Sequence, residues 1–275
     1  MRRLAFLGPP GTFTEEAAIL YDPQAQLLSF ASIGACAASI TSDVAEEGVV
    51  PIENSLEGSV TETLDVLIHD SHLSIGNELI LPIEHYLLAK PGLASGDVKV
   101  VYSHPQALAQ CRRFLERSLP GADVVAALST AAAVEEMMAR DSAAAIGNRR
   151  AAKLYGASVL ADGIQDKAGN VTRFVVLARA DQPPTGHDKT SLAFTFAVED
   201  RPGLLAGALD EFASRQINLS KIESRPSRER LGTYIFLVDV DGHRLDADVA
   251  EALARVEANC SFFRVLGSYP RYREG

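Results

Sequence analysis

Cysteines are few in this 275-residue chain and basic residues are outnumbered, and both features exclude classes of protein. The three cysteines, Cys36, Cys111 and Cys260, are odd in number and widely spaced, so they predict neither a disulfide framework nor a zinc site. Aspartate and glutamate number 36 against 26 lysines and arginines, which gives a formal net charge of −10. Because nucleic acids and anionic membranes attract basic surfaces, we expect neither as a partner.

Long uninterrupted apolar segments are also missing. The apolar run Leu4–Leu7 is ended at once by the Gly-Pro-Pro-Gly segment of residues 8–11, so it is too short for a signal-peptide core or a membrane span. Without an export signal, and with unpaired cysteines, a cytoplasmic location is expected. The apolar stretch 73–89 is interrupted by Gly76 and Pro82. We therefore predict that it forms strands that pass between two lobes.

Short β-rich runs alternate with helical patterns over residues 1–180. The predicted strands are Leu4–Leu7, Gly48–Ile52, Val98–Tyr102, Asp123–Ala127, Ala143–Ile146 and Val171–Ala178. Such alternation is typical of parallel βαβ units, so an α/β domain is expected. Residues 181–189 are rich in proline, glycine and aspartate, and they are predicted to be a domain linker.

The remaining residues, 190–275, predict a smaller second domain. Its expected elements, in order, are strand Ser191–Val198, helix Gly203–Ser214, strand Asn218–Ser224, strand Thr233–Val240, helix Asp246–Asn259 and strand Ser261–Ser268. This βαββαβ order is the ferredoxin-like plan. Such a domain commonly covers an exposed strand edge with a second copy, so a homodimer or homotetramer is expected.

Two polar turns in the first domain each follow a strand and precede a helix. In the first, Thr12 and Glu15 have the spacing of a capping box; the second is the segment Pro51–Ser59. Taken alone, each is more simply explained as an ordinary strand-to-helix turn. Because such turns lie at the carboxyl ends of strands and expose backbone N–H groups, together they predict a crevice for a small anion.

Four motifs in a fixed order resemble the prephenate dehydratase family, whose members convert prephenate to phenylpyruvate. They are Gly8–Ala18, Pro51–Val60, Ser103–Leu108 and the Thr-Arg-Phe sequence at residues 172–174. Residues 223–227 are similar to a segment of the phenylalanine-sensing ACT domain. The resemblance implies a two-lobed, periplasmic-binding-protein-like catalytic domain followed by a ferredoxin-like ACT domain.

The resemblance also implies the site residues. It gives catalytic roles to Thr172, Glu53, Asn54, Ser103 and Gln110, and substrate-binding roles to Thr12, Ser55, Arg173 and Phe174. Thr172 is expected to donate a hydrogen bond to the hydroxyl that leaves. No metal and no redox cofactor is implied, because the reaction needs a held geometry and a proton donor.

Three of these side chains keep a second interpretation. By its residue type alone, Thr172 is more simply a β-branched residue of a half-buried strand. Strand alternation puts Arg173 on the face opposite to Thr172, so a structural ion pair is as good an interpretation as a fork to a substrate carboxylate. Three interpretations of Glu53 stay open: a protonated carboxyl group, a group that orients a donor, or a support for the hinge. His104 is expected to be structural.

The effector expected from the ACT resemblance is L-phenylalanine, which would bias the catalytic cleft between open and closed states. The residues implied for it are Gly203, Leu204, Leu205, Ala206, Asn218, Leu219, Glu223 and Ser224. The Gly-Leu-Leu-Ala sequence stands where the family usually has Gly-Ala-Leu-Val, which leaves the local fit of the pocket open.

Two alternative functions fit the same chain. One is an arogenate dehydratase, since no residue separates the two substrates, and the other is a non-enzymatic protein that binds a small acid. A dehydrogenase or an aminotransferase would need a G-x-G-x-x-G sequence after a strand or a cofactor lysine, and neither is evident.

Overall fold

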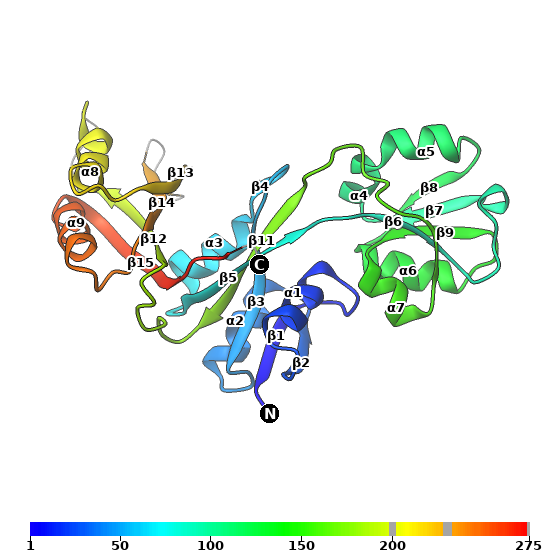
Figure 1. The fold of residues 1–275 in the computed structure, drawn as a ribbon, viewed down its shortest axis with the longest axis horizontal. Coiled ribbons are helices and arrows are strands. Elements are labelled where there is room, and N and C mark those ends of the chain that lie inside the picture. The colour runs from blue at the N-terminus through cyan, green and yellow to red at the C-terminus, as the bar shows by residue number, and fades with distance from the viewer. Residues whose placement is uncertain (198–201, 228–232, 274–275) are drawn as a thin grey trace. The chain divides into compact units, whose positions relative to one another are not determined.

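The computed structural model describes residues 1–197, 202–227 and 233–273, which form two compact units. The first unit consists of Met1–Val60 and Leu79–Phe174, and the second of Thr61–Glu78 and Val175–Gly275. Figure 1 gives the element labels used below. The predicted strand end at Val198 lies outside the described residues.

The first sheet has the strand order β2-β1-β3-β11-β5, with β4 paired to β3. Its strands are β1 (Arg3–Leu7), β2 (Gln26–Phe30), β3 (Glu47–Asn54), β4 (Gly58–Ser59), β5 (Ser74–Pro82) and β11 (Val171–Ala178). Strand β1 is parallel to β2 and β3, and α1 (Phe13–Tyr21) and α2 (Ile33–Thr41) pack on these strands. The expected α/β class is confirmed here.

The second sheet has the order β10-β6-β9-β7-β8. Its strands are β6 (Tyr86–Ala89), β7 (Val100–Ser103), β8 (Asp123–Ala126), β9 (Ala143–Gly147) and β10 (Ser158–Ala161). Its helices are α4 (Pro105–Gln110), α5 (Arg112–Ser118), α6 (Thr130–Met138) and α7 (Arg149–Tyr155), and a short 3-10 helix covers Ser95–Asp97. In Figure 1, α4 and α5 lie on one side of this sheet and α6 and α7 on the other.

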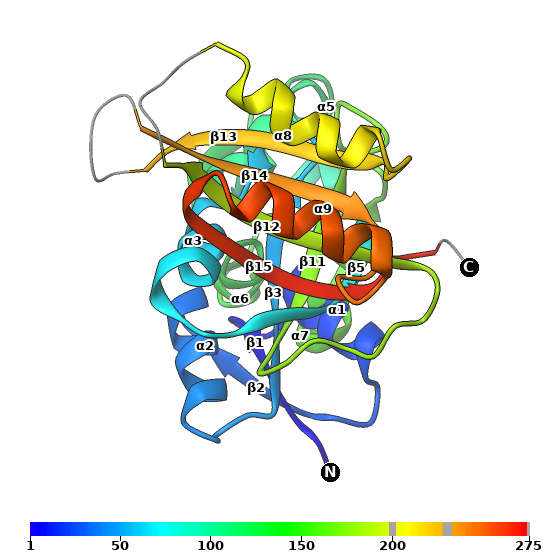
Figure 2. The ribbon, with the colours of Figure 1, turned by 90° about the vertical axis from the view of Figure 1, so that its left-hand side faces the viewer.

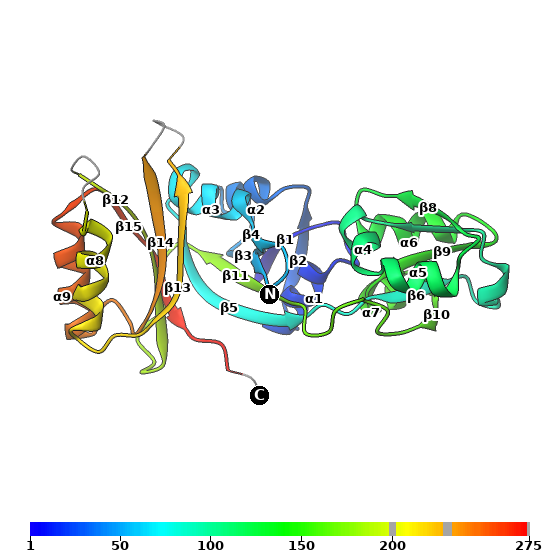
Figure 3. The ribbon, with the colours of Figure 1, turned by 90° about the horizontal axis from the view of Figure 1, so that it is seen from above.

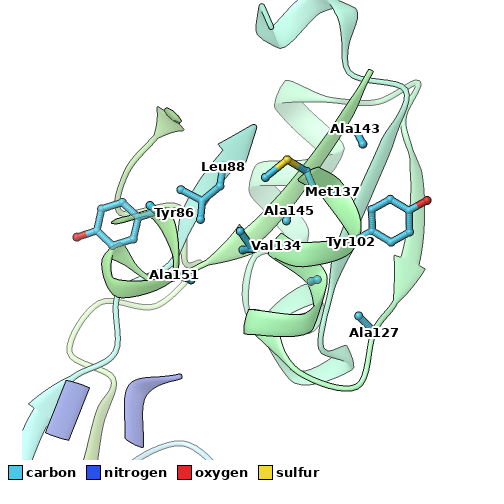
Figure 4. Packing of buried hydrophobic residues seen from close by; sticks show 11 residues of the cluster. Tyr86, Leu88, Tyr102, Ala127, Val134, Met137, Ala143, Ala145 and Ala151 are labelled. Carbon is cyan, nitrogen blue, oxygen red and sulfur yellow. The ribbon is translucent and has the colours of Figure 1, made fainter. Parts of the chain in front are cut away.

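Apolar side chains fill both faces of the second sheet. On one face, Val134 and Met137 of α6 pack against Leu88 and are fully buried, as Figure 4 shows. On the other face, Leu115 and Cys111 pack against strand residues. Burial, together with the charge of a neighbouring aspartate, raises the pKa of the Cys111 thiol to about 12, so this cysteine is a packing residue without thiolate character.

The chain passes between the two sheets at two places. Strand β5 of the first sheet leads through residues 83–85 into β6 of the second. Strand β10 leads back through residues 162–170 into β11 of the first. The two connections are joined, because the backbone N–H of Ile83 donates to the carbonyl of Asn170 at 2.8 Å. We call the lobe formed by residues 86–161 the inserted lobe.

The second unit contains a four-stranded sheet of order β13-β14-β12-β15. Its elements are β12 (Asp188–Phe196), α8 (Leu204–Ala213), β13 (Leu219–Pro226), β14 (Tyr234–Asp241), α9 (Ala247–Glu257) and β15 (Cys260–Pro270). This confirms the βαββαβ order expected for the C-terminal region. Figure 2 shows α8 and α9 on one face of the sheet, where they bury Phe212 and Phe194 completely.

The opposite face of this sheet lies against α3 (Thr61–Asp65) and the π-helix Val66–Asp70, as Figure 3 shows. Arg225 of β13 pairs with Asp65, and Arg264 of β15 donates to the carbonyl of Ile68 at 3.2 Å. No helix in the described ranges is long and apolar enough to span a membrane.

A buried ion pair fixes β12 to β5 within the second unit. The Nζ of Lys189 lies 3.0 and 2.9 Å from the two carboxylate oxygens of Glu78. The residues are 8% and 3% exposed. The same carboxylate also accepts a hydrogen bond from the backbone N–H of Tyr272 at 3.0 Å.

Candidate active site

The first unit contains a cavity of about 430 Å³, whose walls come from the first sheet and its helix α1, from the connections between the sheets and from helices and loops of the inserted lobe. This volume is within the roughly 300–1,000 Å³ typical of small-molecule sites. Three helices begin at its wall, with the cap residues Thr12 (α1), His104 (α4) and Ser129 (α6). Each cap side chain accepts a hydrogen bond from a backbone N–H of its own first turn, at 3.0 to 3.3 Å. Positive helix termini therefore meet at one cavity.

Glu15 ties the first polar turn to the inserted lobe. Its carboxylate accepts from the backbone N–H of Gly11 at 2.6 Å and from Arg150 of α7 at 3.0 and 2.8 Å. Burial alone would raise the pKa of Glu15, but the hydrogen bonds from Arg150 and Gly11 hold it below its ordinary value. Gly11 has a φ of +89°, and a Cβ there would lie 3.3 Å from Ala131 of α6. The turn is thus specific for glycine where the lobes meet.

Thr172 lies on β11 in the cavity wall and is 8% exposed. Its Oγ1 accepts a hydrogen bond from Nδ2 of Asn54 at 2.8 Å. The orientation of the Asn54 amide is fixed, because its Oδ1 accepts from the backbone N–H groups of Leu56 at 2.9 Å and Glu57 at 3.1 Å. Since Asn54 can only donate to Thr172, the hydroxyl proton of Thr172 is left for another acceptor.

The same network extends to both connections between the sheets. Oδ1 of Asn170 accepts from Nδ2 of Asn54 at 2.8 Å, and Nδ2 of Asn170 lies 3.2 Å from Oε1 of Gln110. That oxygen also lies 2.9 Å from Nε2 of His85. A continuous chain of hydrogen bonds therefore joins Thr172 on the first sheet to His85 and to Gln110 on α4.

Sequence reasoning missed Asn170 and His85. Strand alternation could have found Asn170, because it stands two residues before Thr172 and so lies on the same face. For His85 the only signal is a polar residue between two apolar strands. It is 3% exposed, and its ring meets the ring of Phe13 edge-on with centroids 6.0 Å apart. Burial lowers the pKa of His85 below its ordinary value, which keeps the ring neutral near pH 7.

Five of the predicted catalytic-domain residues line the cavity. They are Thr12, Asn54, Gln110, Thr172 and Phe174. Ser55 is not among the lining residues; its Oγ accepts from the backbone N–H of Val171 at 3.0 Å and donates to Oδ1 of Asn170 at 3.3 Å.

Three other predicted residues are not among those that line the cavity. Ser103 is completely buried, and its Oγ donates to the carbonyl of Ile146 at 2.8 Å. Arg173 and Glu53 form an ion pair with 3.7 Å between charged atoms. Arg173 thus has the contact that strand alternation indicated as the alternative to a substrate carboxylate.

The predicted effector residues lie at the start of α8 and on β13 of the second unit. Gly203 caps α8 with a φ of +94°, a conformation that favours glycine. Leu204, Leu205 and Ala206 form the first turn of that helix. Asn218 precedes β13, which contains Leu219, Glu223 and Ser224 and is an edge strand of its sheet. The carboxylate of Glu223 lies 3.4 Å from Nζ of Lys221.

Comparison with known proteins finds similarity along nearly the whole chain. A family model described as "Prephenate dehydratase" matches residues 4–182, and one described as "ACT domain" matches residues 194–258. A prephenate dehydratase from Mycobacteroides abscessus is 42% identical over 281 residues, which cover 98% of this chain and 91% of the relative.

Solved structures agree with this similarity. The crystal structure of a prephenate dehydratase from Arthrobacter aurescens in complex with L-Phe has a TM-score of 0.88 and 41% identity, covering 98% of this chain and 90% of its own. A structure described as GqqA, a novel type of quorum quenching acylase, also has a TM-score of 0.88, with 30% identity and 98% coverage of both chains.

Proposed function

The chain belongs to the prephenate dehydratase family, and from this premise we propose that its cavity converts prephenate to phenylpyruvate, carbon dioxide and water. The observation that carries the assignment of the cavity is the orientation of Asn54, which leaves the hydroxyl proton of Thr172 for a ligand. The activity belongs to phenylalanine biosynthesis, since phenylpyruvate is the keto acid of phenylalanine.

Prephenate needs little from the protein beyond geometry and a proton. The bond between the ring and its carboxylate breaks, and that electron pair enters the ring, which becomes aromatic. The ring C–O bond breaks with its electron pair on oxygen, and the hydroxyl takes up one proton and leaves as water. Thr172 donates a strong hydrogen bond to this hydroxyl as the C–O bond breaks, and solvent supplies the net proton.

The two carboxylates of prephenate are held by N–H groups in this proposal. None of the side chains that line the cavity in the described part of the chain is a lysine or an arginine. The N-termini of α1 and α6 both reach the wall, at Thr12 and Ser129, and helix N-termini bind anions. We assign supporting roles to Glu53, Ser55, Ser103 and Arg173, which lie outside the cavity wall.

The experiment that tests this function is the formation of phenylpyruvate by the purified protein, without added metal or cofactor. We expect turnover of prephenate, and a parallel assay with arogenate measures the preference between the two substrates. Absence of turnover with both substrates would contradict the proposal and favour a protein that only binds a small acid.

The similarity to GqqA, which is described as an acylase, suggests acyl transfer as a second candidate activity. An acylase needs a nucleophile that is activated by a base or by a lowered pKa. Here the hydroxyl of Thr172 is paired with the amide of Asn54, and the hydroxyl of Ser103 with a backbone carbonyl. We therefore propose dehydration and not acyl transfer for this cavity.

We propose three segments for the chain: a catalytic region of residues 1–180, a linker of residues 181–189 and a C-terminal domain of residues 190–275. We further propose that L-phenylalanine regulates the enzyme by binding this C-terminal domain. The effector would lie between two paired copies near α8 and β13, so the enzyme would be a homodimer or homotetramer. Ile222 and Tyr234, on β13 and its neighbour β14, are each 48% exposed, which supports a partner at this edge.

Free thiols at all three cysteines support a cytoplasmic location.

Glu223→Ala is expected to weaken phenylalanine binding about tenfold or more, because it removes a charged hydrogen-bond acceptor from the proposed effector site. Turnover without phenylalanine should not change. Calorimetric titration with phenylalanine and the dehydratase assay measure the two effects. Glu257→Ala, at an exposed position on α9, is the matched control. Unchanged affinity in the Glu223 variant would contradict the assignment.

A further inference from the structure

The hydrogen-bond network fixes the orientation of three amide side chains in sequence. Two backbone N–H groups fix the oxygen of Asn54, so its Nδ2 faces Asn170. The oxygen of Asn170 faces Asn54 for a second reason. Ser55 Oγ, which accepts from the N–H of Val171, also donates to Asn170 Oδ1. Nδ2 of Asn170 must therefore face the next partner, Gln110.

This orientation decides the tautomer of His85. Oε1 of Gln110 accepts from Asn170, while Nε2 of Gln110 faces the carboxylate of Glu57, which accepts only, at 3.4 Å. The same Gln110 oxygen lies 2.9 Å from Nε2 of His85. Nε2 of His85 therefore carries the proton and donates it. Because the ring is neutral, Nδ1 is a hydrogen-bond acceptor, and its lone pair is not used by any hydrogen bond of the described residues.

Nδ1 of His85 has no hydrogen-bond partner within the described part of the chain, although the residue is only 3% exposed. A buried polar atom without a partner costs stability, so its presence calls for an explanation. His85 is also one of the residues that line the cavity containing Thr172. The natural partner for this atom is therefore a ligand of the cavity.

We propose that His85 is a substrate-binding residue, whose Nδ1 accepts a hydrogen bond from the ring hydroxyl of the substrate. The inference rests on the proposed function. At neutral pH the carboxylates and the keto group of prephenate only accept hydrogen bonds, so the ring hydroxyl is its only donor. An acceptor in the wall therefore recognises the end of the substrate that carries the leaving group.

Thr172 and His85 then have complementary roles toward one hydroxyl. His85 accepts a hydrogen bond from the hydroxyl. This orients the hydroxyl so that a lone pair of its oxygen faces the donor Thr172. When the C–O bond breaks and the oxygen gains a proton, the resulting water keeps both hydrogen bonds. Because His85 orients the hydroxyl, we expect its loss to lower kcat more than it weakens the affinity for the substrate.

Two variants separate this role from a structural one. An asparagine side chain reaches the position of Nδ1, so His85→Asn keeps an acceptor for the substrate and loses the contact with Gln110. A glutamine side chain reaches the position of Nε2, so His85→Gln keeps the contact with Gln110 and loses the acceptor. We expect kcat to fall about 10- to 100-fold in His85→Gln and only a few-fold in His85→Asn, with small changes in KM.

The outcomes are distinct. If His85→Asn is impaired as much as His85→Gln or more, His85 acts only through Gln110 and the proposal is overturned. If both variants keep the activity of the wild type, the proposal is also overturned. A wild type without dehydratase activity would instead overturn the proposed function, and this inference with it. Thermal unfolding of both variants checks that they fold.

A spectroscopic measurement keeps the test independent of variants at His85. In the Thr172→Ala protein, labelled with ¹⁵N at the histidine rings, prephenate should bind without being consumed rapidly. We expect the Nδ1 resonance of His85 to begin in the unprotonated range and to shift toward the protonated range when prephenate is added. Phenylpyruvate lacks the ring hydroxyl and should not cause this shift. An Nδ1 that is protonated in the ligand-free protein would refute the tautomer and the proposal.

Discussion

Thr172→Ala is expected to lower kcat for prephenate dehydration by about 100- to 10,000-fold, the range that a positioned proton donor contributes. The variant loses the hydroxyl that Asn54 orients toward the cavity, while the cavity and its helix N-termini stay in place. KM should therefore change much less than kcat. Initial rates of phenylpyruvate formation at saturating and at low prephenate separate the two constants.

Thr172→Ser is the matched control for that result. Serine keeps a hydroxyl that can accept from Asn54 and donate to the substrate, so it should keep much of the activity. Thr172→Val keeps the shape of threonine without the hydroxyl, and it should be as impaired as the alanine variant. Equal rates for the alanine and serine variants would show that Thr172 is not the donor.

Lys189→Met is expected to destabilise the second unit by about 3–5 kcal/mol, the typical cost of removing one partner of a buried ion pair. The Glu78 side chain, which is 1% exposed, would lose the cation of Lys189 from its buried carboxylate. The backbone N–H of Tyr272 would remain as a donor to this carboxylate, but it brings no full charge. Urea denaturation followed by circular dichroism measures the loss in the free energy of unfolding.

Removing both charges should recover most of this loss. In the double variant Lys189→Met with Glu78→Gln, the amide oxygen still accepts from Tyr272 and both charges of the pair are removed. Arg112→Met is the control at the surface, because Arg112 and Glu116 form an exposed pair, and exposed pairs contribute about 0–1 kcal/mol. A Lys189 variant as stable as this control would show that the buried pair contributes little.

Many of the strands that the sequence predicts have a clear pattern of burial, although β8, whose side chains are all exposed, was also expected. Strand β9 is apolar and buried, and β11 is apolar except for Thr172 and Arg173; both were expected within one residue at each end. Strands β2 and β10 were not expected. Both lie at sheet edges, and their side chains are mostly exposed or half-buried, so no apolar run or clean alternation marks them.

The candidate site also contains some residues that the sequence predicts and others that it does not. Thr172, Asn54 and Gln110 stand in motifs, and the structure brings them to one cavity. His85 and Asn170 take part because the two connections between the sheets lie side by side, although they are 85 residues apart in the chain. A pairing over that distance leaves no local pattern in the sequence. A motif also does not show where its side chains point, as the buried Ser103 illustrates.

Insertion of one lobe into the other has a consequence for synthesis on the ribosome. The inserted lobe is built from one continuous segment, residues 86–161. Strand β3, in contrast, pairs with β11, whose first residue is 117 positions after the last residue of β3. Because chains fold as they emerge, the inserted lobe can be complete while β3 still has an open edge. The strand that closes this edge is the one that carries Thr172. A nascent chain therefore cannot assemble this active site until that strand has emerged and joined the sheet.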